Sequence, residues 1–275
     1  MTKTFIKMHG LGNDFAIFDG RSQKLQITPE KIRALGNRRT GIGFDQMVII
    51  DPPKSPETDV FLRIYNADGG EVGACGNASR CIGKLLISEL KKPEVVLETK
   101  AAKLKAKMAG NNVTVDMGNV YLKWQEIPLS IEKDTVSLPL SEGGLSQPVA
   151  VNVGNPHAVF FVDNAEKVAL AEIGPKIEHN PLFPERVNVE VAQVLSPTKI
   201  RMRVWERGVG ITQACGTGAC AAAIAGVRRG LTQRKATVIL DGGTLDIEWR
   251  ESDNHVLMTG DASAVYLGEI DDERF

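Results

Sequence analysis

Runs in which apolar and polar residues alternate occur as three successive short segments in each half of the chain. In the first half these runs cover residues 95–99, 104–108 and 113–117, and in the second half 237–240, 244–249 and 256–260. Alternation with a period of two, interrupted by turn residues, is typical of β-strands joined in a meander. The pattern therefore predicts a similar group of short strands in each half.

Helical periodicity follows a glycine-rich loop in each half. We expect helices over residues 79–91 and 219–229, and a further helix over 29–37, where Thr28 is placed to cap it and Pro29 to begin it. A sheet curled around the first of these helices would bury its apolar stripe, which consists of Ile82, Leu85, Leu86 and Leu90. The expected fold class is α+β, with a curled, mixed or mostly antiparallel β-sheet around one central helix in each half.

The two halves also share sequence landmarks, as a duplicated domain would. The segment Ala-Cys-Gly-Asn around Cys75 returns as Ala-Cys-Gly-Thr around Cys215, 140 residues later. Upstream, at the same offset, apolar residues, an arginine and an aromatic coincide between residues 60–66 and 200–206. The agreement in order and spacing indicates a duplication.

Two landmarks nearer the start of each half repeat with an offset of 142 residues. Gly12 to Phe15 corresponds to Gly154 to His157, and Phe44 to Gln46 corresponds to Arg186 to Asn188. Variation in loop length accounts for the two-residue difference between the offsets. We therefore predict two pseudo-symmetric domains, the first formed by residues 1–118 plus 264–275 and the second by residues 119–263.

The composition excludes several classes of protein. The 275 residues include 33 Lys and Arg against 34 Asp and Glu, a formal net charge of −1, so no basic excess points to nucleic acid. The first residues lack the apolar run of a secretory signal, and no apolar stretch is long enough to span a bilayer. We expect a cytoplasmic protein that binds neither nucleic acid nor membrane.

The four cysteines form two pairs, Cys75 with Cys81 and Cys215 with Cys220. Neither spacing is that of C-x-x-C, so a zinc site or a thioredoxin-like centre lacks its usual signature, and four cysteines are too few for a disulfide framework. Cys81 and Cys220 fall inside predicted helices, where cysteine usually serves as a small buried hydrophobe. We predict no metal site, and Cys75 and Cys215 are the candidates for chemistry.

Both candidate cysteines stand between a glycine-rich loop and a predicted helix. The unsatisfied N–H groups and the helix dipole at such a position favour thiolate over thiol, so we expect the pKa of both thiols to fall below the ordinary value of about 8.5. The same N–H groups can bind a carboxylate. If the two loops face each other across a cleft, one sulfur can remove a proton from a carbon while the other delivers one to its opposite face. This chemistry is stereoinversion, and no Schiff-base lysine motif or nucleotide fingerprint indicates a cofactor.

The residues alone leave other hypotheses open. Cys75 and Cys215 could form a structural disulfide, although a cytoplasmic setting argues against it. A thiol redox or sensor protein would cycle between the two oxidation states of this pair. A binding module without catalysis would keep its function when Cys75 is replaced by alanine.

Three motifs closely resemble the diaminopimelate epimerase family. They are Gly10-Leu11-Gly12-Asn13-Asp14-Phe15, the segment from Ala74 to Cys81, and the segment from Glu206 to Ala219. The resemblance covers essentially the whole chain. It implies conversion of LL- to meso-diaminopimelate in the synthesis of lysine and peptidoglycan precursors, by a homodimer that uses two cysteines and no cofactor.

The resemblance also assigns roles to individual residues. Cys75 and Cys215 correspond to the acid–base pair, and His157 and Glu206 to residues that tune cysteine protonation. The positions that correspond to substrate-binding residues are Asn13, Gln46, Asn66, Gly76, Asn77, Asn155, Asn188, Glu206, Arg207, Gly216 and Thr217. Guanidinium and amide groups of this kind suit an amino acid with two charged ends. One departure is Ala78, where the family often has glycine, and we expect an ordinary helical backbone there.

The nearest rival within enzymes is a cofactor-independent racemase of proline, hydroxyproline or histidine. Such a substrate has one charged end and needs fewer distal partners. Arg207 together with Asn66 and Asn188 favours a two-ended substrate.

Overall fold

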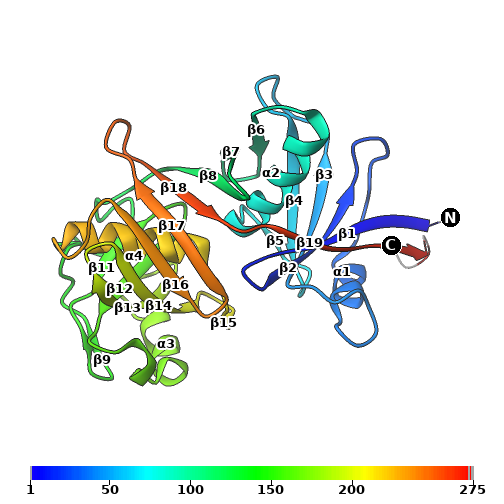
Figure 1. Ribbon diagram of the computed structural model, residues 1–275. Helices are drawn as coiled ribbons and strands as arrows, with labels where there is room; N and C mark the ends of the chain where they lie inside the picture. Colours follow the sequence, from blue (N-terminus) through cyan, green and yellow to red (C-terminus); the bar gives the residue numbers. More distant parts are fainter. Residues whose placement is uncertain (1, 272, 274–275) are drawn as a thin grey trace. The chain divides into compact units, whose positions relative to one another are not determined.

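The computed structural model describes residues 2–271 and 273 (Figure 1). The chain divides into two compact units, one formed by Met1–Val115 with Gly260–Phe275 and the other by Asp116–Thr259. The boundaries fall within strands β8 (Asn112–Asn119) and β18 (His255–Gly260). The sequence analysis instead ended the first domain at residue 118 and resumed it at 264. The common origin of the two parts stays a prediction.

The first unit is built mainly from strands. They are β1 (Thr2–Gly10), β2 (Asn13–Asp19), β3 (Gln46–Asp51), β4 (Val60–Asn66), β5 (Glu71–Val72), β6 (Glu94–Glu98), β7 (Lys103–Ala109) and β19 (Ser263–Asp271), with helices α1 (Pro29–Gly36) and α2 (Gly76–Leu90). Strand β1 pairs antiparallel with both β2 and β19, and β2 runs parallel to β3. Strand β3 is antiparallel to β4, which runs parallel to β6, and β6 is antiparallel to β7.

The second unit repeats this order. Its strands include β11 (Val149–Asn152), β12 (Pro156–Phe161), β13 (Asn188–Ser196), β14 (Lys199–Glu206), β15 (Gly210–Ile211), β16 (Lys235–Leu240) and β17 (Gly243–Trp249); it also contains β9 (Ser141–Glu142), β10 (Leu145–Ser146), the 3₁₀ helix η1 (Ala165–Lys167), α3 (Leu170–Glu178) and α4 (Gly216–Arg228). Strand β11 is antiparallel to β12, β12 is parallel to β13, β13 is antiparallel to β14, β14 is parallel to β16, and β16 is antiparallel to β17. The two units thus share one strand topology, and the predicted α+β fold of two similar parts is confirmed.

Each unit places its principal helix against its strands. Helix α2 contacts β1, β6 and β7, and α4 contacts β11 to β14, β16 and β17, so that the strands curl around it (Figure 1). Helix α4 is rich in alanine and buried over most of its length, and small side chains let strands approach a helix from several sides. In α2 the predicted stripe is only partly buried: Ile82 and Leu86 are inaccessible, but Leu90 is 38% exposed. The prediction was wrong for Leu90 because the whole last turn of α2, which ends at Lys91 in a left-handed conformation, faces solvent.

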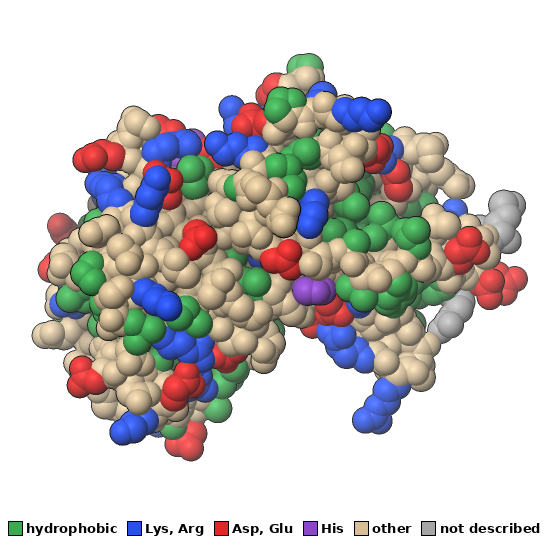
Figure 2. Space-filling model, in the orientation of Figure 1, with side chains coloured by type: hydrophobic (Ala, Val, Ile, Leu, Met, Phe, Trp, Pro, Cys, Tyr) green, Lys and Arg blue, Asp and Glu red, His purple; other side chains and the backbone are tan. Residues whose placement is uncertain are grey.

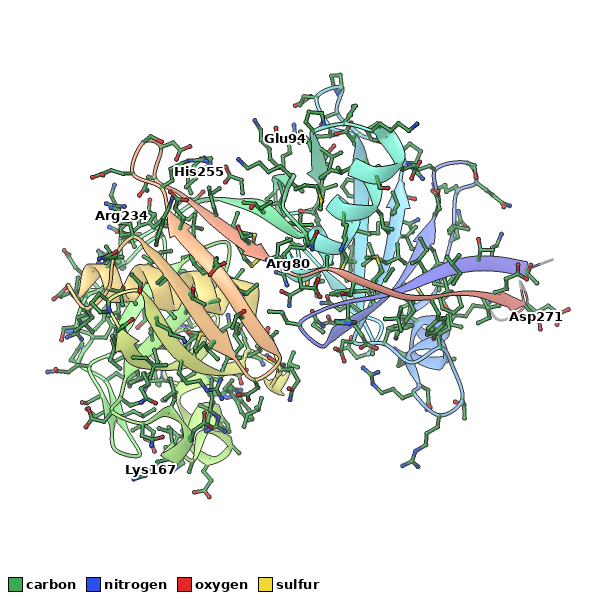
Figure 3. The ribbon with its side chains drawn as sticks, viewed as in Figure 1. Arg80, Glu94, Lys167, Arg234, His255 and Asp271 are labelled. Carbon is green, nitrogen blue, oxygen red and sulfur yellow. The ribbon has the colours of Figure 1, made fainter. Side chains whose placement is uncertain are left out.

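Two basic side chains fix α2 to the chain segment that leads into β19. Arg80 is completely buried, and its Nε donates to the carbonyl oxygen of Asp261 at 3.1 Å (Figure 3). One turn further along, Lys84 Nζ donates to the carbonyl oxygen of Ala262 at 2.7 Å. These hydrogen bonds hold the helix that carries Cys75 in place. No helix among the described residues is both long and apolar enough to cross a membrane.

Candidate functional site

Cys75 and Cys215 are the N-cap residues of α2 and α4. Both have extended backbones, with φ and ψ of −147° and 114° for Cys75 and −118° and 110° for Cys215. The Sγ of Cys75 accepts from the N–H of Ala78 at 3.5 Å, and the Sγ of Cys215 accepts from the N–H of Gly218 at 3.3 Å. Each sulfur therefore takes the place that a serine or aspartate oxygen usually has at a helix N-terminus.

The two helices begin three residues earlier than the sequence predicted. Their first turns contain Gly76 and Asn77 in α2, and Gly216 and Thr217 in α4. The N–H groups in the first turn of a helix have no acceptor within the helix and point toward its N-terminal end. They are therefore suited to bind a carboxylate next to each sulfur.

In the first unit, the amide side chain of Asn13 lies next to the sulfur of Cys75. Asn13 Oδ1 lies 3.9 Å from Cys75 Sγ and accepts from Asn77 Nδ2 at 3.1 Å. The Nδ2 of Asn13 donates to Asp45 Oδ2 at 3.1 Å. Because Asp45 holds the nitrogen of this amide, Asn13 directs its oxygen toward the cysteine.

Asp45 belongs to a chain of charged groups. Arg38 Nη2 lies 2.7 Å from Asp45 Oδ1 and 2.6 Å from Asp14 Oδ1, and Lys7 Nζ lies 2.6 Å from Asp14 Oδ2. Burial raises the pKa of Asp14, but hydrogen bonds and charges from Arg38 and Lys7 outweigh it and hold the pKa well below the ordinary value. Asp14, held as a carboxylate, and Asp45 thus share Arg38 behind Asn13.

Gln46 and Asn66 stand opposite each other on the antiparallel strands β3 and β4. Gln46 Nε2 donates to Asn66 Oδ1 at 2.9 Å. Gln46 Oε1 is buried and has no hydrogen-bond partner among the residues that the structure describes. This acceptor is available to a ligand.

In the second unit, Cys215 lies next to a partly buried carboxylate. Glu206 is the last residue of β14, and Thr212 Oγ1 donates to its Oε1. Burial raises the pKa of Glu206, while hydrogen bonds from Thr212 and Cys215 act in the opposite direction. Thr217 Oγ1 lies 3.5 Å from Cys215 Sγ.

The protonation expected for Cys215 has to be corrected. Burial raises the pKa of the Cys215 thiol well above its ordinary value, and the negative charges of Glu206 and Glu190 add to the effect. Hydrogen bonds from Thr217 and the Gly218 N–H act in the opposite direction but are smaller. The prediction of a lowered pKa was wrong for Cys215, because it considered the helix terminus and neither the burial of the residue, which is 4% exposed, nor the two carboxylates.

His157 forms a buried pair with Glu190. Both are fully inaccessible, and His157 Nδ1 lies 2.7 Å from Glu190 Oε1. The other ring nitrogen, Nε2, lies 2.9 Å from Asn155 Oδ1. The ring thus connects Glu190 with Asn155, one of the residues expected to bind substrate.

Asn188 joins the start of β12 to the turn that follows β14. Its Nδ2 donates to the carbonyl oxygen of Pro156 at 2.9 Å, and its Oδ1 accepts from the N–H of Arg207 at 3.0 Å. The guanidinium of Arg207 donates to the carbonyl oxygen of Glu185 at 2.8 Å. Asn188 therefore places the loop that carries Arg207, and one N–H of its own amide remains for a ligand.

The structure links Asn13 and Asn77 to Cys75, and Glu206 and Thr217 to Cys215. Gln46 and Asn66 instead contact each other, and their role in the site stays a prediction. The sequence analysis missed Asp45 and Glu190 as part of the site. A signal was present for Glu190, which is the only charged residue in the apolar run from Val187 to Ala192. Ala78 has an ordinary helical backbone, as expected, and Cys81 and Cys220 are fully buried inside their helices. Among the described residues, no three His, Cys, Asp or Glu side chains are grouped to hold a metal ion.

Solved structures with the same fold differ widely from this chain in sequence. A hydroxyproline epimerase from Agrobacterium vitis superposes with a TM-score of 0.70 at 16% identity, covering 98% of this chain and 92% of that one. A probable proline racemase from Agrobacterium radiobacter K84 gives 0.71 at 18% identity, covering 99% and 94%. These likenesses establish the fold.

Sequence relatives are much closer. The family model of diaminopimelate epimerase matches residues 5–123 and 149–265. The diaminopimelate epimerase of Rhodospirillum centenum is 52% identical, covering 98% of this chain and 93% of that protein. The enzyme of the same name from Erythrobacter litoralis is 51% identical and covers 98% of both. The resemblance found in the sequence and the expectation of an isomerase are confirmed, and the chain belongs to the diaminopimelate epimerase family.

Proposed function

We propose that this protein interconverts LL- and meso-2,6-diaminopimelate in the synthesis of lysine and peptidoglycan precursors. The reaction inverts one α-carbon through two-cysteine acid–base catalysis and needs no cofactor. Membership of the family, together with about half of all residues identical to curated diaminopimelate epimerases over nearly the full length, supports this substrate.

The observation that carries the mechanism is the equivalent position of the two cysteines. Each caps the principal helix of its unit, directly after the same sequence of strands. Inversion requires one group that accepts a proton and one that gives a proton, on opposite faces of the same carbon. In our proposal both half-sites contact one substrate, and each supplies one of these groups.

The surroundings of Cys75 and Cys215 differ, and the reaction requires the two cysteines to differ in protonation. The raised pKa of Cys215 keeps it a thiol, which is the form that donates a proton. Cys75 is half-buried, with its sulfur facing the start of α2, and in our proposal it is the thiolate base of the resting enzyme. For the reverse reaction the two protonation states are exchanged.

Charge develops on the substrate as the α-proton leaves, and it spreads onto the carboxylate. We assign the stabilisation of this charge to the first-turn N–H groups of Gly76, Asn77, Gly216 and Thr217. Donors that are already oriented toward the developing charge lower the barrier without any cost of reorganisation. The distal end of the substrate has its own ammonium and carboxylate. In this proposal the residues that bind it are Glu206, Arg207, Asn66, Asn155 and Asn188.

The direct test compares substrates and cysteine variants. We expect turnover of LL-diaminopimelate and none of proline or hydroxyproline. Cys75→Ala and Cys215→Ala should each lower epimerisation by about 10²- to 10⁴-fold, the range typical of a lost acid or base. Cys81→Ala is the matched control, because Cys81 is a buried cysteine in the interior of α2. Turnover of proline instead, or full activity of both cysteine variants, would contradict the proposal.

We also propose a homodimer in the cytoplasm. Val265, Tyr266 and Leu267 of β19 are 56%, 46% and 78% exposed, and hydrophobic side chains gather on this part of the first unit in Figure 2. Exposed contiguous apolar side chains commonly mark an interface between proteins. A reducing compartment agrees with a reaction that needs two thiols.

A further inference from the structure

The His157–Glu190 pair is fully buried and lies behind the predicted substrate contacts of the second unit. The two residues belong to the adjacent parallel strands β12 and β13. Glu190 Oε2 has no hydrogen-bond partner among the described residues. A carboxylate with so few partners is strongly destabilised away from water unless a cation compensates its charge.

The contacts of the imidazole show which protonation state fits. Nδ1 faces a carboxylate oxygen of Glu190 at 2.7 Å, and Nε2 faces the amide oxygen of Asn155 at 2.9 Å. Both partners are acceptors as placed, so both ring nitrogens must donate. A neutral imidazole has a single N–H, whereas an imidazolium has two.

The other titratable groups near this ring are Glu206 at the end of β14 and Cys215 at the start of α4. Glu206 and His157 influence each other electrostatically, and Glu190 acts on both Glu206 and Cys215. An imidazolium therefore has two carboxylates as neighbours and a thiol that burial keeps uncharged.

The first unit has no such pair. Its strands β2 and β3 pair in the same register as β12 and β13, which places Phe15 and Val48 at the positions of His157 and Glu190. Phe15 and Val48 are completely buried. Two apolar side chains thus occupy the place where the second unit has an ion pair.

A further difference makes room for Glu190. A Cβ atom at Gly218 would lie 2.9 Å from Glu190 Oε1 and 3.3 Å from Cys215 Sγ. The corresponding residue of the first unit is Ala78, which has that Cβ atom. The glycine lets the carboxylate approach the first turn of α4 closely.

Asn13 and Asn155, the equivalent asparagines of the two units, consequently have their amide groups held by opposite ends. In the first unit Asp45 binds the nitrogen of Asn13, so the amide oxygen faces Cys75. In the second unit the imidazole binds the oxygen of Asn155, which leaves the amide nitrogen as a donor. An amide oxygen suits an ammonium, and an amide nitrogen suits a carboxylate.

We infer that Glu190 is a positioning residue that holds His157 as an imidazolium and thereby turns the amide nitrogen of Asn155 toward a substrate carboxylate. Glu190 itself does not contact substrate. The inference rests on the proposed function for the identity of the substrate, but the state of the imidazole does not depend on it. Asp45 orients the amide of Asn13 in the first unit, but there the amide oxygen, and not the nitrogen, faces the site.

The first experiment reads the protonation of the ring in the unmodified protein. The chain has four histidines, so nitrogen chemical shifts of the rings can be assigned by comparison with His9→Gln, His179→Gln and His255→Gln. At about pH 8, above the ordinary histidine pKa of about 6.5, we expect the imidazolium signature for His157. His179, which is exposed, is the internal reference for a ring open to solvent. A neutral His157 ring under these conditions would overturn the inference.

The second experiment uses Glu190→Gln, which keeps the shape and removes the charge. We expect the His157 ring to become neutral at pH 8 and the KM for diaminopimelate to rise about tenfold to a hundredfold, as for a lost hydrogen bond to a charged group. The kcat should change less. Glu178→Gln is the matched control, since Glu178 is a buried carboxylate of the same unit that binds Trp205 and the Gly208 N–H; the His157 ring should stay protonated in it.

The outcomes separate the two proposals. An unchanged KM in Glu190→Gln despite a neutral ring would overturn the positioning role. A protonated His157 in a protein that does not turn over diaminopimelate would instead contradict the proposed function and leave the role of Glu190 in orienting the ring intact.

Discussion

At the scale of single residues, the two cysteines have the same position and different surroundings. Cys215 is surrounded by carboxylates and protein atoms, so its thiol resists losing a proton. Cys75 is more exposed and faces the amide oxygen of Asn13. Burial and neighbouring charge therefore decide the protonation of Cys215 more strongly than the helix terminus that both cysteines share.

The difference predicts how each thiol reacts with an alkylating reagent. Since thiolate is the reactive form, Cys215 should reach its plateau rate at a higher pH than Cys75. Glu206→Gln should move the Cys215 profile to lower pH, because a nearby negative charge that favours the thiol has been removed. Peptide mapping of iodoacetamide-labelled protein, with each rate normalised to its own plateau, measures both profiles. Identical profiles for the two cysteines would count against the assignment.

A second prediction concerns Asp14. Its pKa is lower in the folded protein than in the unfolded chain, so its contribution to stability is complete above the ordinary carboxyl pKa and is lost as the pH falls through the folded value. Asp14→Asn should lower the free energy of unfolding by about 2–3 kcal/mol at pH 7. The difference from the unmodified protein should shrink as the pH is lowered below about 4. Denaturant unfolding at a series of pH values measures it, and a difference independent of pH would refute the role of the ionised carboxylate.

At the scale of elements, the sequence predicted helices α1, α2 and α4 and the strands β6 to β8 and β16 to β18. It gave no prediction for α3 or for the strands β1 to β3 and β11 to β13, and it placed the helix beginnings less well. The starts of α2 and α4 were placed three residues late because cysteine is not among the usual N-cap residues. The predicted helix at 29–37 begins at Pro29 with Thr28 as its N-cap, as expected. Local patterns define an element's interior, whereas its first turn depends on which side chain satisfies the N–H groups.

Helix α4 allows a direct test of the space next to Cys215. Gly218→Ala should destabilise the protein by about 1–3 kcal/mol, because the added methyl group meets Glu190 and the sulfur, and epimerase activity should fall. The matched change in α2, Ala78→Gly, should cost about 1 kcal/mol through helix propensity alone. Thermal unfolding of both variants compares them. Equal stability of Gly218→Ala and the unmodified protein would show that the site has more room than described.

At the scale of the whole molecule, one strand topology occurs twice, and the repeated landmarks in the sequence predicted this. The side-chain contacts in which the two units differ could not be predicted from the sequence. Glu190 is 33 residues from His157, and Asp45 is 32 residues from Asn13. Such pairs depend on the register of adjacent strands, and a slip of one residue would turn each side chain to the other face of its sheet.

The exposed strand β19 predicts the oligomeric state. Leu267 is 78% exposed next to Tyr266 and Val265, so Leu267→Lys would place a charge in the proposed interface between copies. We expect a dimer for the unmodified protein and a monomer for the variant in sedimentation velocity at micromolar concentration. A monomeric unmodified protein would contradict the proposed homodimer without affecting the chemistry of the cysteines.

The most direct measurement of the central claim follows the hydrogen on the inverted carbon. LL-diaminopimelate is converted in deuterium oxide, and the early product and the remaining substrate are analysed separately by mass spectrometry. Two cysteines that act on opposite faces predict one deuterium in each molecule of meso product and almost none in the remaining substrate. Product that retains the original hydrogen would mean that a single group removes and returns the proton, and the two-cysteine account would then be wrong.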